Sequence, residues 1–135
     1  MKIIWKEIEL ATRSRAQFVD VTRQVAEELT KSNVKSGMCY VYVPHTTAGI
    51  TINENADPDV VTDLINTLEK LVPVHGNYRH AEGNSDAHLK ASMMGFSQLI
   101  PVIDGRLALG TWQGIYFCEF DGPRKRKMLM GISGE

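Results

Sequence analysis

The chain has 135 residues and a mass of 15.1 kDa, with 15 Lys and Arg residues against 16 Asp and Glu residues, and 43% of its residues are hydrophobic. This length predicts one domain, residues 1–135, that can bury a core without metal or disulfide support. The near-zero net charge argues against a broadly basic nucleic-acid-binding protein, and no apolar stretch approaches the roughly 20 residues of a membrane span. We expect a cytoplasmic protein with neither nucleic acid nor a membrane as partner.

Periodicity in the first half of the chain predicts strands around one helix. Apolar residues at helical spacing predict a helix between Asp20 and Ser36, with Gly37 as its C-terminal cap. Alternating or continuous apolar runs predict the strands, and a loop at residues 44–48 joins the last two. The expected strands are residues 1–10, 38–43 and 49–53.

The clearest helix signal begins at Asp57, which can cap a helix that has Pro58 at its first position and that Pro73 ends. Residues 74–83 have no periodicity, and a short helix is expected at residues 86–94.

Four apolar runs in the last third of the chain are separated by Asp-Gly and Gly-Pro steps, which predict antiparallel hairpins at residues 104–105 and 121–123. The runs are residues 98–103, 106–109, 111–120 and 126–132. Strands dominate and two principal helices cross over, so the expected fold class is α+β.

Three of the four histidines stand where chemistry can occur. His45 follows Pro44 at the end of a predicted strand, where it is either a structural loop residue or a ligand. His80 and His88 are eight positions apart with Gly83 between them, a spacing that can place a loop imidazole and a helix-start imidazole on one ion. Three imidazoles with an open position are typical of a catalytic zinc site.

Three carboxylates each allow two or more roles. Glu54, at a strand end, can be a general base, a metal ligand or a loop cap. Glu119 alternates with Ile115 and Phe117, so it is either buried with a partner or exposed at a strand end. Asp86 either caps a helix or accepts a hydrogen bond from an imidazole N–H and so orients His80 or His88.

Anion binding is expected from one arginine and several hydroxyl groups. Arg124 follows a Gly-Pro turn, where it is either a phosphate or carboxylate clamp or the solvated tip of a hairpin. Thr47 and Ser92 carry hydroxyl groups that can join such a site.

Taken together, motifs spread over essentially the whole chain resemble the YjbQ-like family, whose members are often labelled secondary thiamine-phosphate synthase. The motifs are Pro44-His45-Thr46-Thr47-Ala48-Gly49-Ile50, Ile52-Asn53-Glu54, Asp57-Pro58, the segment from His80 to His88, Leu109-Gly110-Thr111-Trp112-Gln113, and Glu119 with Asp121-Gly122-Pro123-Arg124. The resemblance implies a compact α+β domain of two packed, mainly antiparallel sheets with two principal helices, and a homotrimer. It also implies synthesis of thiamine phosphate from a pyrimidine diphosphate and a thiazole phosphate.

The same resemblance implies one shared site. The metal ligands would be His45, His80 and His88, and imidazoles favour zinc, with magnesium as the alternative. The implied catalytic residues are Glu54, Asp86 and Glu119, and Arg124, Thr47 and Ser92 would bind the phosphate of a small phosphorylated molecule. A metal-dependent hydrolase and a non-catalytic binding or accessory protein are the alternative functions.

Overall fold

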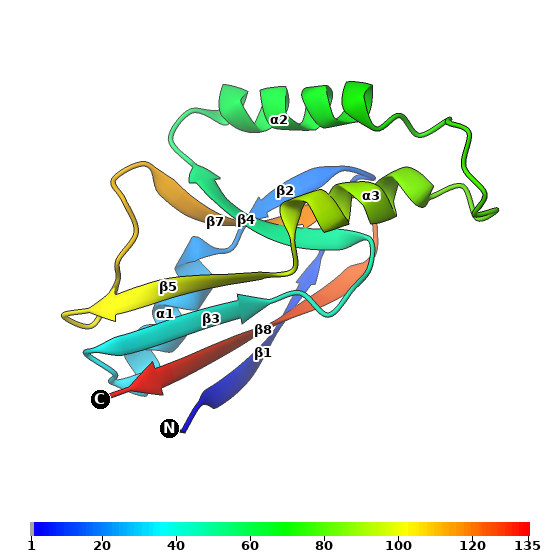
Figure 1. The fold of residues 1–135 in the computed structure, drawn as a ribbon. Helices are drawn as coiled ribbons and strands as arrows, with labels where there is room; N and C mark the ends of the chain where they lie inside the picture. Colours follow the sequence, from blue (N-terminus) through cyan, green and yellow to red (C-terminus); the bar gives the residue numbers. More distant parts are fainter. Residues whose placement is uncertain (1) are drawn as a thin grey trace.

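The computed structural model describes residues 2–135, so Met1, with which the first predicted strand began, lies outside the described residues. The elements are β1 (Ile4–Ala11), β2 (Gln17–Asp20), α1 (Thr22–Ser32), β3 (Gly37–Tyr42), β4 (Ala48–Glu54), α2 (Pro58–Leu71), α3 (Ser85–Met94), β5 (Ser97–Ile103), β6 (Arg106–Leu107), β7 (Gln113–Glu119) and β8 (Lys125–Gly134). They form two antiparallel sheets, a larger sheet in the order β1-β8-β3-β5-β6 and a smaller sheet in the order β2-β7-β4 (Figure 1). The α+β class is confirmed, and the three helices within residues 2–135 correspond to the two principal helices and the short helix expected at residues 86–94. Within residues 2–135, no helix is both long enough and apolar enough to cross a membrane.

The main core lies between the two sheets. Alternate side chains of β3 and β8, such as Val41 and Met130, point toward Ile50 and Phe117 of the smaller sheet. The amphipathic helix α1 adds its apolar stripe to this core. On its other side, the smaller sheet is covered by α2 and α3, which enclose a second apolar cluster (Figure 1). The sheets therefore provide a rigid base on which α3 is held.

The outward face of the larger sheet carries aromatic and aliphatic side chains and is not covered by a helix (Figure 1). Trp5, Gly131, Tyr40 and Leu99 stand in one row across β1, β8, β3 and β5. The Trp5 ring lies over Gly131, where a Cβ would come within 2.7 Å of it, and its centroid is 6.3 Å from that of Tyr40. We call this surface the outer apolar face. Its members are Trp5, Met38, Tyr40, Tyr42, Leu99 and Ile103.

The first helix is shorter than predicted. It ends at Ser32, and Asn33 takes the left-handed conformation, with φ of 60°, that an asparagine tolerates. This early end lets Val34 turn into the core, and Gly37 starts β3 where it was expected to cap the helix. Strand β2 was not predicted, because four residues are too few for alternation to be visible.

One of the two predicted hairpins is confirmed and the other is wrong. Asp104 and Gly105 both have positive φ, and β5 pairs with β6 around them, as in a tight two-residue hairpin. The turn at residues 121–123 instead carries the chain from the smaller sheet to the larger one. Strands β7 and β8 cannot pair with each other because each already has a strand on both sides.

Candidate functional site

Two of the predicted histidines meet at the start of α3. The ring centroids of His80, in the preceding loop, and His88, in the first turns of the helix, lie 5.4 Å apart with the rings nearly perpendicular. A cavity of about 370 Å³ opens beside them, and its lining residues are Tyr78, Arg79, His80, Ser85, His88 and Leu89. The structure thus brings a loop imidazole and a helix imidazole side by side, and their sharing of one ion stays a prediction.

A buried ionic network holds this end of α3. The carboxylate of Asp86, which is fully buried, accepts two hydrogen bonds from Arg15 at 2.9 and 3.1 Å and one from Lys90 at 2.9 Å. Lys90 is also buried and donates to Glu69 of α2 at 3.0 Å. The network therefore ties α3 to α2 and to the loop that follows β1.

Neither role predicted for the Asp86 carboxylate matches these contacts. Asn84 is the N-cap of α3, and both Asp86 oxygens are taken by Arg15 and Lys90, with no imidazole among their partners. Burial raises the pKa of Asp86, but the hydrogen bonds from Arg15 and Lys90 outweigh burial and leave that pKa lowered. Asp86 is therefore an ionised anchor of the helix that carries His88.

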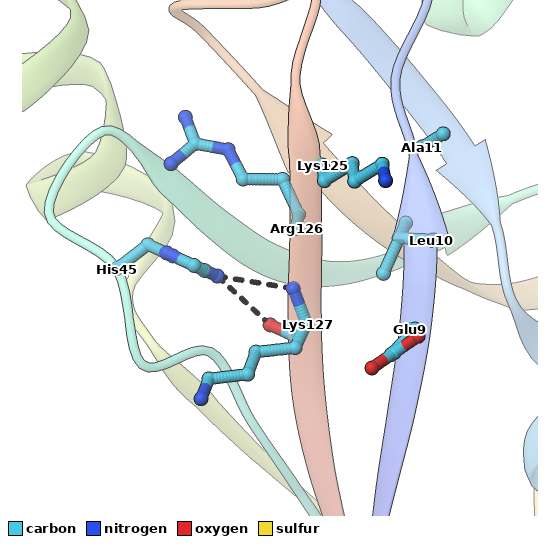
Figure 2. A pocket seen from close by; sticks show the side chains of 7 residues that line it. All are labelled: Glu9, Leu10, Ala11, His45, Lys125, Arg126 and Lys127. Carbon is cyan, nitrogen blue, oxygen red and sulfur yellow. Dashed lines mark hydrogen bonds between the residues drawn. The ribbon is translucent and has the colours of Figure 1, made fainter.

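His45 lies on a separate part of the surface, in the loop between β3 and β4. Its Nε2 atom is 3.1 Å from both the amide nitrogen and the carbonyl oxygen of Lys127 in β8 (Figure 2). Burial lowers the pKa of His45, and the charge of Arg126 lowers it further, so the neutral imidazole is favoured. A cavity of about 560 Å³ adjoins the ring, and its lining residues are Glu9, Leu10, Ala11, His45, Lys125, Arg126 and Lys127.

Glu119 is completely buried and faces Arg126 across the two sheets. Its carboxylate accepts from Nε of Arg126 at 2.8 Å, from Nη2 of the same guanidinium, from the Thr12 hydroxyl at 2.7 Å and from two backbone amides. Arg126 then donates to the Thr47 hydroxyl at 2.8 Å. Of the two readings of Glu119, the buried one with a partner is correct.

Burial raises the pKa of Glu119, yet the bonds from Arg126 and Thr12 outweigh that effect and leave the pKa lowered. With every acceptor position occupied, the Glu119 carboxylate has no free position from which to take a substrate proton. This geometry gives Glu119 a structural role.

The other predicted residues are dispersed. Arg124 donates from Nε and Nη2 to Asp121 at 2.9 and 3.0 Å, so its own turn orients it. Ser92 is exposed on α3. Glu54 ends β4, about 20 Å along the strand from the loop that holds His45.

Within residues 2–135, no three His, Cys, Asp or Glu side chains are grouped closely enough to hold a metal ion. His80 and His88 line one cavity and His45 another, so a single copy brings two of the three predicted ligands together. A catalytic zinc ion commonly takes three protein ligands, and the pair at α3 is therefore one ligand short.

The sequence did not predict a role for several polar residues in the hydrogen-bond networks around Glu119 and Asp86. They are Thr12, Arg15, Asn84, Lys90, Asp121 and Arg126. Two of them carried a usable signal. Arg126 has the same strand parity as Met128 and Met130, which marks it as inward-facing, and Lys90 is four residues after Asp86 on one helix. Thr12 and Arg15 lie in a loop and gave no such signal.

The comparisons with known proteins agree on one family. The profile described as "UPF0047 protein YjbQ-like" matches residues 6–135. A UPF0047 protein of Methanocaldococcus jannaschii is 51% identical over 135 residues, covering 100% of this chain and 97% of that protein. The UPF0047 protein YugU of Bacillus subtilis is 50% identical over 130 residues, covering 96% and 98%.

Solved structures share the fold. A protein of this family from Clostridium acetobutylicum has a TM-score of 0.94 at 55% identity, covering 95% of this chain and 99% of that one. A protein of unknown function from Sulfolobus solfataricus has a TM-score of 0.95 at 34% identity, covering 99% of both chains.

The buried Glu119 carboxylate predicts a specific acid response. Because its pKa in the folded state is below that in the unfolded state, it stabilises the fold above about pH 4.5, and this stabilisation is lost as the pH falls through the lowered value. We expect Glu119→Gln to reduce the free energy of unfolding at pH 7 and to make it fall less steeply below pH 5. Urea denaturation of both proteins at a series of pH values measures the two slopes, and equal slopes would contradict the assignment.

Proposed function

The chain belongs to the UPF0047 protein YjbQ-like family, and we propose that it is a metal-assisted enzyme that acts on a small phosphorylated molecule at a site formed between copies of the chain. The observation that carries the proposal is the pair of His80 and His88, which lines an open cavity and lacks a third ligand, while His45 is held at a second cavity. A second copy can supply what each cavity lacks.

Zinc is the metal that we propose. Imidazole nitrogens suit zinc, whereas magnesium prefers oxygen ligands and keeps several waters. His80 and His88 of one copy and His45 of another would hold it and leave one position open. A zinc ion so bound would act as a Lewis acid toward a phosphate or activate a water.

The outer apolar face supports assembly of the chain as a homotrimer. Trp5 is 53% exposed, Leu99 50% and Tyr42 45%, and all three lie on the same face of the larger sheet. Contiguous exposed apolar surface of this kind is typical of protein interfaces. Closed rotational symmetry would cover this face in every copy and bring neighbouring loops together.

The substrate phosphate is proposed to bind beside His45. Lys125 and Lys127 line the cavity there, and Figure 2 shows both on the same strand as Arg126. Arg124 lies on the adjacent turn with Nη1 left over after its bonds to Asp121. Thr47 and Ser92 stay in the proposal as hydroxyl donors, although neither lines this cavity in a single copy. These groups would stabilise the negative charge of a leaving pyrophosphate.

The reaction that the family resemblance favours joins a pyrimidine diphosphate to a thiazole phosphate. The thiazole nitrogen forms a bond to the pyrimidine methylene carbon as the carbon–oxygen bond to pyrophosphate breaks. Among the three proposed catalytic carboxylates, Glu119 and Asp86 are ion-paired, whereas Glu54 makes no ion pair within the described residues. Bond formation at the thiazole nitrogen releases no proton, so Glu54, presented by a neighbouring copy, is the group that we propose to donate a proton to an oxygen of the departing pyrophosphate.

The first prediction concerns the metal and its third ligand. Wild-type protein is expected to hold about one zinc per chain, and both His45→Ala and the double variant His80→Ala, His88→Ala to hold little. Co-expression of the two variants is expected to restore about a quarter of the wild-type zinc. A complete site needs the His45→Ala chain on one side of the interface and the double variant on the other, and random mixing gives this in about a quarter of the interfaces. Elemental analysis of the tag-free proteins measures this. No recovery in mixed oligomers would exclude a site shared between copies.

The second prediction concerns the oligomer. Light scattering coupled to size-exclusion chromatography is expected to give three times the chain mass of 15.1 kDa. Trp5→Glu combined with Leu99→Glu should give a monomer, since burying two carboxylates in an apolar interface is costly. The matched control is Trp112→Glu, an exposed tryptophan outside the outer apolar face. An unchanged mass in the double variant would place the interface elsewhere.

The third prediction concerns turnover. Zinc-loaded protein with a pyrimidine diphosphate and a thiazole phosphate is expected to form thiamine phosphate and pyrophosphate, and Glu54→Gln to lower the rate 10²-fold or more, about the size of a general acid–base contribution. Product chromatography with each substrate alone is the control. Release of inorganic phosphate from the diphosphate alone would favour the hydrolase, and no turnover of any phosphorylated compound would favour a binding protein.

A further inference from the structure

The loop between β3 and β4 is fastened to β8 at two neighbouring residues. His45 contacts the peptide group of Lys127 through Nε2, and Thr47 accepts from the side chain of Arg126. Only Thr46 separates the two attachment points on the loop. Figure 2 shows the first of these contacts, and His45, Arg126 and Lys127 all line the cavity beside it.

The peptide group of Lys127 is available because β3 ends too early to cover it. The last β3 residue that pairs with β8 is Tyr42, opposite Leu129. In an antiparallel ladder the N–H and C=O of one residue point to the same side, and those of Lys127 point to His45, away from β1. By the β3–β8 register, the position opposite Lys127 would fall to Pro44, two residues beyond Tyr42, and the imidazole takes that place.

This arrangement limits what each ring nitrogen of His45 can do. Nε2 either accepts from the Lys127 N–H or, when it carries the proton, donates to the Lys127 carbonyl. Either tautomer keeps the ring in the same place. Within residues 2–135 the ring makes hydrogen bonds through Nε2 alone, so Nδ1 is left for another partner.

We propose that Nδ1 is the metal-coordinating nitrogen of His45 and that Thr47 and Arg126 are the residues that position its ring. The inference rests on the proposed function, in which His45 binds a metal. A metal ion on Nδ1 requires the ring proton to be on Nε2. The Nε2–H group then donates a hydrogen bond to the Lys127 carbonyl, as the second nitrogen of a metal-binding imidazole usually does.

Arg126 is suited to this positioning role because it cannot easily move. Its side chain is 3% exposed and its guanidinium is paired with Glu119, which is itself fully buried. The one Nη2 group that bonds Glu119 also donates to the Thr47 hydroxyl at 2.8 Å and approaches the Thr47 carbonyl at 3.4 Å. Loss of the hydroxyl leaves Thr47 with contacts through its carbonyl oxygen alone, to Nη2 of Arg126 at 3.4 Å and to the Phe120 amide at 3.2 Å.

The test compares Thr47→Val, which removes the hydroxyl and keeps the shape, with Thr47→Ser, which keeps the hydroxyl. Hydrogen exchange of single amides, followed by NMR in the metal-free protein, is the readout. In Thr47→Val the Lys127 amide is expected to exchange at least about tenfold faster, while the Met130 amide inside the ladder changes less than about twofold. Thr47→Ser should behave as wild type, and His45→Ala should show the fastest Lys127 exchange.

Two results would overturn the positioning role. One is an unchanged Lys127 amide in Thr47→Val, and the other is an equal acceleration of Lys127 and Met130, which would mean a general loss of stability. A second NMR measurement determines which ring nitrogen of His45 coordinates the metal. The ring proton is expected on Nδ1 in metal-free protein and on Nε2 after zinc is added, and zinc on Nε2 with loss of Lys127 protection would contradict the proposal. If zinc does not bind at all, the metal site fails, while the Thr47 comparison still decides the positioning role.

Discussion

A buried ion pair between the two sheets fixes the geometry of this end of the molecule. Glu119 ends β7 of the smaller sheet, and Arg126 lies in β8 of the larger one. Removal of one partner from such a pair typically costs about 3–5 kcal/mol, because the remaining charge stays buried. Hydrogen bonds from the pair reach Thr12 after β1 and Thr47 before β4, so the pair joins four strands and the loop that carries His45. The position of the loop that carries His45 therefore depends on this ion pair.

A second ionic network performs the same task for the other two histidines. Asp86 and Lys90 fasten α3 to Arg15 and Glu69, and the turn between β7 and β8 connects the two networks. In that turn Asp121 accepts from Asn84, and the Gly122 amide donates to the Arg15 carbonyl. The histidines of both cavities are thus attached to one hydrogen-bonded framework, which keeps the two cavities separate within one chain. Our proposal that another copy completes the metal site rests on this separation.

The sequence predicted the elements that are determined by interactions within a single short segment of the chain. The helix after Asp57 and the hairpin at Asp104-Gly105 were found because capping and turn chemistry are local. Strand β2 was missed because it is too short for alternation to be visible. The true course of the 121–123 turn was missed because it depends on which strand edges are already occupied. The same limit applies to the site. The sequence indicated that Glu119 needs a partner, but the identity of Arg126 and Thr12 as partners comes from the packing of two sheets.

The proposed function depends most on one metal ion that is shared between copies of the chain. The most direct measurement is a crystal structure of zinc-loaded protein with anomalous diffraction at the zinc edge. We expect one peak at each subunit boundary, bound by His80 and His88 of one protomer and by His45 of the partner subunit through Nδ1. A zinc ion held within a single chain, or zinc peaks away from these three histidines, would contradict the account.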